Sequence, residues 1–277
     1  MKKNERAAAI VRTIVVSLIA VLFVVPLVWM VLSSLKTAPE VFARPFHWLP
    51  ARVQWQNYAT VWMNEEASML RAFANTLYIA LFSIIGQMFI SSLAAYSFAK
   101  INFKGKQVVF MLFLSSMMVP SQLTIIPRFM LFKTIGLYNN LWAIILPAFF
   151  GATSIFMLRQ FYMGLPNDLI EVAKIDGAGH LRIFLRIMLP LTKAALMSLI
   201  ILTFISSWNE YMAPLIFLVK KELYTVSQNI QWYMLDEFKE HNLTMAAATS
   251  AIVPVVILFI VGQKYFVEGI ATSGVKG

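Results

Sequence analysis

The sequence predicts an all-α integral membrane protein with six transmembrane helices and both termini in the cytoplasm. Of its 277 residues, 60% are hydrophobic and only 13% are charged, and the mean hydropathy is +0.73. A soluble domain carries about 25% charged residues, so this surface suits a bilayer better than water. Inside a bilayer only helices and closed barrels satisfy the backbone, and the apolar runs here are far longer than the roughly ten-residue segments of a barrel.

Six long apolar runs define the expected transmembrane helices. Five contain no charged residue, and the fifth in chain order is broken only by Glu210. Each is long enough to cross the hydrocarbon core, which takes about 20 apolar residues. The runs are 13–35, 72–99, 107–127, 134–158, 194–219 and 241–263. An even number of spans places both termini on the same side of the membrane.

The distribution of basic residues indicates which side that is. If the N-terminus is inside, the inner segments hold 14 of the 23 Lys and Arg. The outer segments, 36–71, 128–133 and 220–240, hold the other 9. The positive-inside rule therefore assigns both termini to the cytoplasm of a multi-pass cell-membrane protein. It also accounts for the net charge of +10, and no basic cluster interleaved with aromatic residues suggests a nucleic acid partner. The first apolar run is too long for a signal-peptide core, so we interpret it as a retained helix.

The first expected outer loop is rich in proline and aromatic residues. It reads TAPEVFARPFHWLPARVQWQNYATVW and contains Trp48, Trp55, Tyr58 and Trp62. Aromatic residues of this kind concentrate at the membrane–water interface. Two interpretations stay open, namely simple anchoring in the interface and a docking surface for a partner outside the cell.

Motifs of enzyme and cofactor chemistry are missing from the sequence. There is no phosphate-binding GxxxxGK[ST] loop, because Gly105-Lys106 is followed by Gln107 and lacks the earlier glycine. The chain has no cysteine, and its three histidines fall on different segments, so no metal site is expected. No serine is matched with a base and an orienting acid. We expect no catalytic residue, no bound cofactor and no enzyme activity in this chain.

Glu210 is the one ionisable residue within an expected span. It lies about 24 Å along the fifth run from the cytoplasmic end, past the bilayer midplane. An intramembrane carboxylate is a functional hypothesis by default, but near the outer face it could instead cap a helix or reach the interface. Pro214 can free a backbone carbonyl near residue 210, so we expect a bend there.

A charged, glycine-containing segment, 164–190, separates the fourth and fifth runs. Asp168 and Glu171 have the spacing of a capping box that begins a short helix, and Asp176-Gly177 ends it. The apolar side of this first helix is Leu169, Val172, Ala173 and Ile175. A second helix is expected from about His180 to Leu189, with Leu181, Phe184, Leu185 and Met188 on one side and Arg182 and Arg186 on another. Such amphipathic helices lie on a membrane or in a groove of a partner.

This segment resembles the EAA loop of ABC importer permeases. The family pattern reads E-A-A, three residues, G, nine residues, I-x-L-P, and the chain matches it in spacing from Glu171 through Gly177 to Pro190. Val172 replaces the first alanine of the pattern. The stretches PLVWMVLSSLK, AAYSFAKINFKGK, SSWNEYMAPLIFL and QKYFVEGIATSGVKG are similar to the carbohydrate-uptake, maltose-type branch, and in particular to the shorter, second permease of the pair.

The resemblance implies a type I ABC importer transmembrane domain, the permease subunit of an ATP-driven sugar importer that forms half of the translocation path. The implied partners are a homologous second permease, two ATP-binding subunits that hold ATP-Mg, an extracytoplasmic sugar-binding protein, the bilayer and the sugar substrate. Three parts of the chain are expected. They are 1–70, the first helix and an external interfacial loop, 71–267, a five-helix permease core with the EAA loop, and 268–277, a cytoplasmic tail that could reach the ATPase.

The resemblance also implies a lever. The first short helix would sit in a groove of the ATPase subunit, Gly177 would allow a sharp angle, and Pro190 would join the segment to the fifth span. The implied coupling residues are Glu171, Val172, Ala173, Ile175, Asp176, Gly177, Ala178, Arg182 and Pro190. Arg182 and Arg186 could pair with acids of the ATPase or could face solvent and lipid headgroups. Candidate residues of the substrate path are Trp208, Asn209, Glu210 and Tyr211.

Two alternative functions stay open, one within the ABC importer class and one outside it. An importer with the same fold could carry glycerol phosphate, a polyamine or an amino acid, although the expected spans contain no Lys or Arg, which favours a neutral solute. An ion-coupled secondary transporter or a channel would need titratable residues within its spans, and here there is only one.

Overall fold

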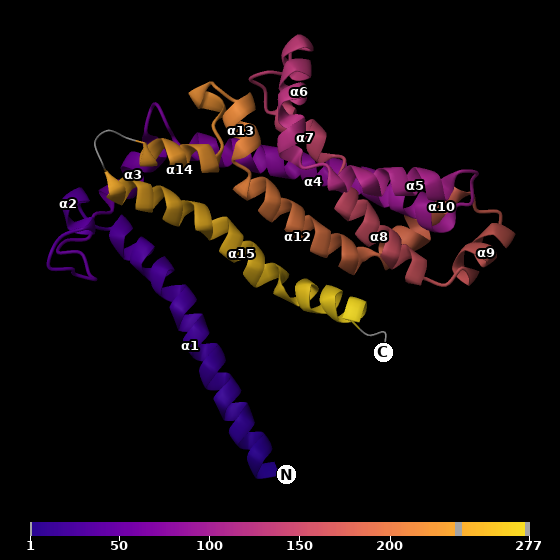
Figure 1. Cartoon of the computed structure of the whole chain (residues 1–277), viewed down its shortest axis with the longest axis horizontal. Helices are drawn as coiled ribbons and strands as arrows, with labels where there is room; N and C mark the ends of the chain where they lie inside the picture. The colour runs from indigo at the N-terminus through magenta and orange to yellow at the C-terminus, as the bar shows by residue number, and fades with distance from the viewer. Residues whose placement is uncertain (1, 236–239, 275–277) are drawn as a thin grey trace. The chain divides into compact units, whose positions relative to one another are not determined.

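The computed structural model of the chain describes residues 2–235 and 240–274, with side chains described for 8–235 and 240–263. Within these residues the regular elements are all helices, as Figure 1 shows. The chain divides into two compact units. Unit 1 comprises Met1–Leu70 and Asn229–Val253, and unit 2 comprises Arg71–Gln228 and Pro254–Gly277.

Between four and six candidate membrane spans occur in the described part of the chain. Four are single helical segments, Ala8–Ser34, Met69–Lys100, Trp142–Met163 and His241–Gln263. Two more are bent pairs, Lys106–Met118 with Ser121–Thr134 at 96° and His180–Leu191 with Lys193–Asn209 at 76°. The predicted all-helical class is therefore confirmed, whereas the count of six holds only if each bent pair is one span.

The boundaries of three expected spans are wrong. The run 107–127 breaks after Val119, because a residue before proline is biased toward extended backbone, and Val119 has a ψ of 113°. Helix α6, Ser121–Thr134, then takes in 128–133, which we expected to be an outer loop. The run 134–158 becomes helical only at Trp142, because Gly136 and Asn139 both adopt positive φ after α6. The run 194–219 breaks at Glu210.

Unit 1 is held together by a buried asparagine. It contains α1 (Lys2–Ser34), α2 (Ala38–Val41), α3 (Gln56–Met63) and parts of α14 (Val226–Met234) and α15 (His241–Gly274). The Asn57 amide Nδ2 donates to the carbonyls of Ser34 and Lys36, both at 2.8 Å, where α1 has ended. Its Oδ1 accepts from Asn242 Nδ2 at 3.0 Å, which ties α3 to α15. The tail expected at 268–277 begins within α15, and residues 275–277 lie outside the described part.

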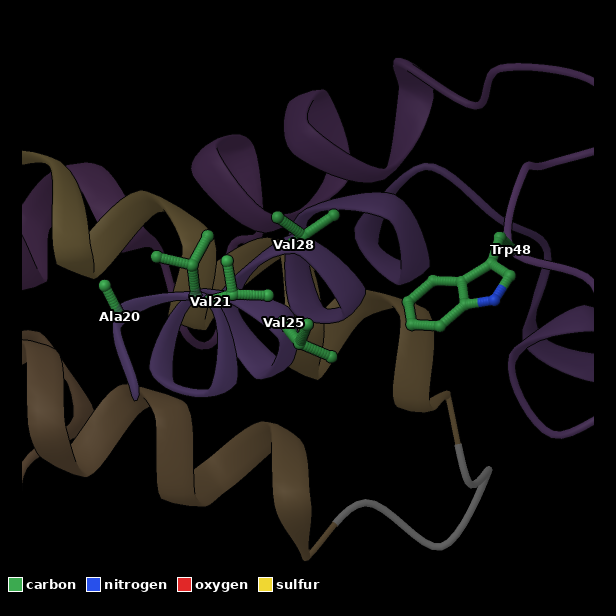
Figure 2. Close-up of a pocket in the computed structure, with 6 residues that line it drawn as sticks. Ala20, Val21, Val25, Val28 and Trp48 are labelled. Atoms are coloured by element: carbon green, nitrogen blue, oxygen red, sulfur yellow. The ribbon is translucent and has the colours of Figure 1, made fainter. Parts of the chain in front are cut away.

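Helix α1 leaves its apolar side chains exposed. Leu22 and Phe23 are each 71% exposed, and none of the side chains in the most apolar stretch of this helix is buried. Figure 2 shows Val25 and Val28 of α1 with the Trp48 ring from the following loop, all of which line a shallow apolar pocket of about 270 Å³. Side chains of this kind need lipid or an apolar partner helix around them.

Unit 2 is built along α4, Met69–Lys100. Two buried clusters lie at different points of this helix, one around Ile79 and one around Ala95 and Tyr96. The first includes residues of α6, α7 and α13, and the second includes residues of α8, α9 and α12. Other elements of this unit are α5 (Lys106–Ser115), η1 (Ser116–Met118), α7 (Trp142–Ala148), α8 (Ala152–Gly164), α9 (Asp168–Ile175), α12 (Lys193–Asn209), α13 (Met212–Phe217) and η3 (Lys221–Leu223).

A polar junction joins three helices between these two clusters. The Gln87 amide of α4 donates from Nε2 to Ser154 Oγ of α8 at 2.9 Å and accepts at Oε1 from Thr203 Oγ1 of α12 at 2.9 Å. A Cβ on Gly151 would lie 2.0 Å from Gln87 Nε2, so the glycine makes room for this contact. Since hydrogen bonds between membrane helices each contribute about 0.6–2 kcal/mol, the junction fixes the three helices to one another.

We expect Gln87→Leu to lower the free energy of unfolding by about 1–2 kcal/mol, because it removes two interhelical bonds and leaves Ser154 and Thr203 without these partners. Denaturation of the detergent-solubilised protein measures the change. Gln263→Leu is the matched control, since Gln263 is exposed and bonds to Ile260 of its own helix. Equal stability of Gln87→Leu and the control would contradict a structural role for the junction.

Candidate functional site: the coupling segment and the break at Glu210

The coupling segment, residues 164–190, begins where α8 ends and α9, Asp168–Ile175, starts. The predicted capping box is wrong, because Asn167 is the N-cap and its side chain makes no capping hydrogen bond. Lys100 at the end of α4 stabilises the turn instead. Its Nζ donates to the Leu165 carbonyl at 2.6 Å and to Asn167 Oδ1 at 2.7 Å. The cation thus satisfies a carbonyl left free at the end of α8 and fixes the start of α9.

A Schellman motif ends α9 at Gly177. The Ala178 N–H donates to the Ala173 carbonyl at 2.9 Å, and the Gly177 N–H donates to the Lys174 carbonyl at 3.0 Å. Gly177 has a φ of +77°, in the left-handed region that favours glycine. A Cβ there would meet no atom within 4 Å, so glycine is needed for its backbone conformation and not for space.

The second half of the segment is not the regular helix that we expected. It consists of α10 (His180–Ile183), a π-helical turn η2 (Phe184–Met188) and α11 (Leu189–Leu191). The wider π turn rotates the later side chains relative to an α-helix. Ile183, Phe184 and Met188 are buried, whereas two of the residues expected on the apolar side, Leu181 and Leu185, are exposed. Pro190 lies within α11, and α12 starts at Lys193 instead of at Pro190.

The coupling segment packs directly on the helices of unit 2. Tyr96 contacts the ring of Phe184 at a centroid distance of 5.4 Å, and its hydroxyl lies 3.2 Å from His180 Nδ1. The segment contributes Ile170, Ala173, Ile183, Phe184 and Met188 to the buried cluster that also holds Ala95, Tyr96, Ile155, Leu158, Tyr162 and Leu199. Sequence reasoning missed Ile170, Lys100 and Tyr96 because no motif marks residues whose partners are distant in the chain.

The outer side of α9 carries exposed apolar residues between charges. Leu169, Val172 and Ile175 are 39%, 58% and 85% exposed. Ala173 is only 8% exposed and packs inward, so its expected place in a groove of a partner is wrong for this structure. Glu171 and Lys174 of α9 and Asp176 at its end are exposed, as are Arg182 and Arg186 in the second half of the segment. An exposed apolar stripe of this kind on a segment outside the candidate spans fits a protein partner.

The junction between the segment and α12 is sharply bent yet hydrogen-bonded. Thr192 donates from its N–H to the Met188 carbonyl at 3.2 Å and from Oγ1 to the Leu189 carbonyl at 2.8 Å. On its other side, the Leu196 N–H donates to the Thr192 carbonyl at 2.9 Å. The backbone bonds therefore continue through the 76° bend, which connects the segment stiffly to α12.

The candidate substrate-path residues lie at the far end of α12, where the helix stops at Asn209. Glu210 leaves the helical conformation, and its Oε1 accepts the Ala213 N–H at 3.0 Å, which caps α13. Trp208 is 3% exposed and stacks on Phe204 at 5.4 Å, so its ring packs inside the protein in this conformation. Asn209, Glu210 and Tyr211 are at least partly exposed. The Asn209 side-chain amide donates to the Ile205 carbonyl of its own helix. The expected bend near residue 210 is thus a complete helix break.

Figure 1 shows the two sites at opposite ends of unit 2, with α9 and α10 at one end and α13 toward the other. Helix α12 connects them, and α4 passes between the two buried clusters. No group of three or more histidine, aspartate or glutamate side chains in the described ranges is arranged to hold a metal ion.

Comparison with known proteins assigns the family. The profile of the family described as "Binding-protein-dependent transport system inner membrane component" matches residues 87–272. The arabinooligosaccharides transport system permease protein AraQ of Bacillus subtilis is 33% identical over 96% of this chain and 95% of its own length. The probable ABC transporter permease protein YurM of the same organism is 32% identical over 91% and 83%.

A solved structure agrees in fold. A crystal structure of a bacterial ABC transporter involved in the import of the acidic polysaccharide alginate superposes with a TM-score of 0.84, at 23% identity, over 95% of this chain and 98% of the other. The chain belongs to the binding-protein-dependent transport system inner membrane components. It is therefore a multi-pass membrane permease of an ABC importer, a transport subunit that works with an ATPase and a substrate-binding protein and is not itself an enzyme.

We expect Gly177→Ala to destabilise the end of α9 by about 1–2 kcal/mol, because a left-handed backbone strains any residue with a Cβ. Gly177→Asn should be milder, since asparagine adopts this conformation more readily. Denaturation of the purified protein and transport by the assembled importer provide the measurements. Gly179→Ala is the matched control, because Gly179 has an ordinary φ of −73°. If the two alanine variants behave alike, the backbone argument for Gly177 is wrong.

Proposed function

We propose that this chain is one of two homologous permeases of a sugar importer and forms half of the path through the membrane. The observation that carries the proposal is the similarity over nearly the whole chain to a permease named for arabino-oligosaccharides. The accessible polar residues at the α12 break, Asn209, Glu210 and Tyr211, are suited to a hydroxyl-rich cargo. The exposed apolar surface of α1 supports a membrane assembly with a second permease, because that surface needs lipid or a partner helix.

Coupling to the ATPase is proposed to run through the outer side of α9. Val172 and Ile175 would enter an apolar groove of the ATPase subunit, and Glu171, Asp176 and Arg182 would lie at its rim. When ATP draws two ATPase subunits together, the segment moves with them. The buried side chains of Ile183, Phe184 and Met188 and the hydrogen-bonded bend at Thr192 then pass the motion to α12. Two features keep the segment rigid during this motion. Pro190 stiffens α11, and the Schellman motif of Gly177 and Ala178 fixes the end of α9.

The proposed topology places both termini and the coupling segment in the cytoplasm. It counts Lys106–Met118 with Ser121–Thr134 as one bent span and takes the fifth span from Lys193 onward, without His180–Leu191. The excess of Lys and Arg in the inner segments supports this orientation. Under this topology the Glu210 break lies toward the outer side, where an extracytoplasmic sugar-binding protein delivers the cargo. The end of the chain, 268–277, lies on the side of the ATPase subunits, which would bind ATP-Mg.

Uptake by the complete importer in proteoliposomes tests the proposal. With both permeases, the ATPase and the binding protein, radiolabelled arabino-oligosaccharide uptake should require ATP hydrolysis and should persist in the presence of a protonophore. Ile175→Glu should lower uptake at least tenfold and reduce co-purification of the ATPase, because it places a charge in the apolar contact. Ile175→Leu keeps the contact apolar and is the control.

The same assay separates the alternatives. Uptake that stops with a protonophore and continues without the ATPase would indicate an ion-coupled secondary transporter. Uptake of sn-glycerol 3-phosphate but not of the oligosaccharide would support an ABC importer and would show that its cargo is not a sugar. Normal ATPase association of Ile175→Glu would contradict docking through α9.

A further inference from the structure

Two cations from neighbouring helices meet at the end of α4. Arg159 of α8 donates from Nε to the Phe98 carbonyl at 3.3 Å. Lys106, the first residue of α5, donates from Nζ to the Ile101 carbonyl at 2.9 Å and to the Ala99 carbonyl at 3.5 Å. Carbonyls at the C-terminal end of a helix attract cations. Because these carbonyls lie together at one helix end, the two positive charges are held close to each other.

Two lysines of the same region add to the positive charge. Lys100 is the last residue of α4 and donates from Nζ to the Leu165 carbonyl and to Asn167 Oδ1. Lys104 is exposed in the turn that leads to α5. We define the cation cluster as Lys100, Lys104, Lys106 and Arg159.

No acid accepts a hydrogen bond from the cation cluster in the described ranges. The acceptors there are backbone carbonyls and the Asn167 amide oxygen, none of which carries a formal charge. The sequence contains no Asp or Glu between Glu66 and Asp168, so α4, α5 and α8 supply no acid to balance the cluster. Like charges held together repel, and an anion from outside the chain would relieve that repulsion.

Arg159 keeps most of its hydrogen-bond donors available. Its guanidinium carbon lies 4.0 Å from the centroid of the Phe110 ring, a cation–π contact that orients the group. Phe98 packs on the same ring at a centroid distance of 5.2 Å. A guanidinium has five N–H donors, and among the described residues only Nε–H of Arg159 has an acceptor. The remaining donors form a fork that matches the paired oxygens of a phosphate.

The cation cluster lies where three membrane helices end. Helix α4 ends at it, α5 begins at it, α8 ends shortly after Arg159, and all three belong to candidate spans. Beside the cluster, α5 exposes the apolar side chains of Val108, Val109 and Leu112. Basic groups at the ends of membrane helices lie at the level of the lipid headgroups, and basic pockets between such helices bind anionic headgroups.

We propose that the cation cluster binds the headgroup of an anionic phospholipid, with phosphatidylglycerol as the simplest case. An acidic surface of the ATPase would also match the charges. The apolar side chains of α5 directly beside them favour a molecule that is anionic at one end and apolar at the other. Bound lipid stabilises the end of α4, where Lys100 also holds the start of the coupling segment. The site does not depend on the cargo, and only the leaflet in which it lies rests on the proposed topology.

Native mass spectrometry of the complete importer tests the site. The importer is released from bilayers of equal parts phosphatidylglycerol and phosphatidylcholine, and the lipids that stay bound are identified. We expect wild type to retain phosphatidylglycerol in preference, and Lys106→Gln with Arg159→Gln to lower that preference about tenfold or more, because each cation near a headgroup contributes to binding. Lys133→Gln with Lys220→Gln removes the same charge from exposed positions and is the matched control. Equal preference of wild type and the Lys106 and Arg159 variant overturns the inference.

A thermal measurement separates lipid binding from the bonds that these residues make to α4. Each protein is compared with itself in phosphatidylcholine bilayers with and without phosphatidylglycerol, so a loss of intrinsic stability cancels. Wild type should gain in Tm from phosphatidylglycerol, because a ligand of the native state stabilises it, and the Lys106 and Arg159 variant should gain much less. An equal gain in the two proteins overturns the inference.

A single variant tests the site without removing any bond to α4. Lys104 is exposed, and Lys104→Gln should lower the preference for phosphatidylglycerol about fivefold. An unchanged preference overturns the site as defined. If the Lys106 and Arg159 variant keeps its lipids and loses the ATPase, the cluster docks that subunit and the inference is wrong. None of these measurements needs transport, so a failure of sugar uptake would reject the proposed function and leave the lipid site standing.

Discussion

The burial of one side of the coupling segment against α4, α8 and α12 is the constraint on which the rest of the structure depends. Ile183, Phe184 and Met188, in the second half of the segment, are almost completely buried. Burial of a large apolar side chain contributes roughly 1.5–3 kcal/mol, so three of them hold the segment far more firmly than its exposed charges could. Because one side is fixed to the permease, the opposite side of α9 is free to present Val172 and Ile175 to a partner.

Hydrogen bonds within and around the segment also fix it to the permease helices. Lys100 fixes its start, the Schellman motif at Gly177 fixes its corner, and Thr192 carries the hydrogen bonding into α12. Beyond it, Gln87 joins α4, α8 and α12 midway between the two buried clusters. A displacement of α9 is therefore expected to move these helices together, because packed interiors resist deformation and shift as bodies. That is the physical requirement for coupling an ATPase at one end to a path at the other.

Composition and spacing were sufficient for the class of fold and for the family. The apolar runs predicted helices in a membrane, and the spacing from Glu171 to Pro190 predicted the family to which the chain belongs. The sequence could not show which apolar residues of the second half face inward, because the helices on which they pack lie far away along the chain. Leu181 and Leu185 are exposed, whereas Ile183 and Met188 are buried.

Residues that act through distant partners also escaped prediction. Gln87 and Lys100 carry no local signal, since their partners lie 65 to 116 positions away along the chain. Arg128 was assigned to a loop because the run of uncharged residues stops there, whereas helix formation depends on the backbone and continues to Thr134. Charge-free runs therefore locate candidate spans but misplace the ends of helices that carry an arginine or lysine.

The most direct test of the account is thiol labelling of single cysteines in α9, which is feasible because the chain contains no native cysteine. Ile175→Cys and Ala173→Cys would be treated with a maleimide in the permease pair alone and in the complex with the ATPase. The account predicts that position 175 labels rapidly in the permease pair and is protected at least tenfold in the complex, while position 173 labels poorly in both. Equal labelling of position 175 with and without the ATPase would contradict it.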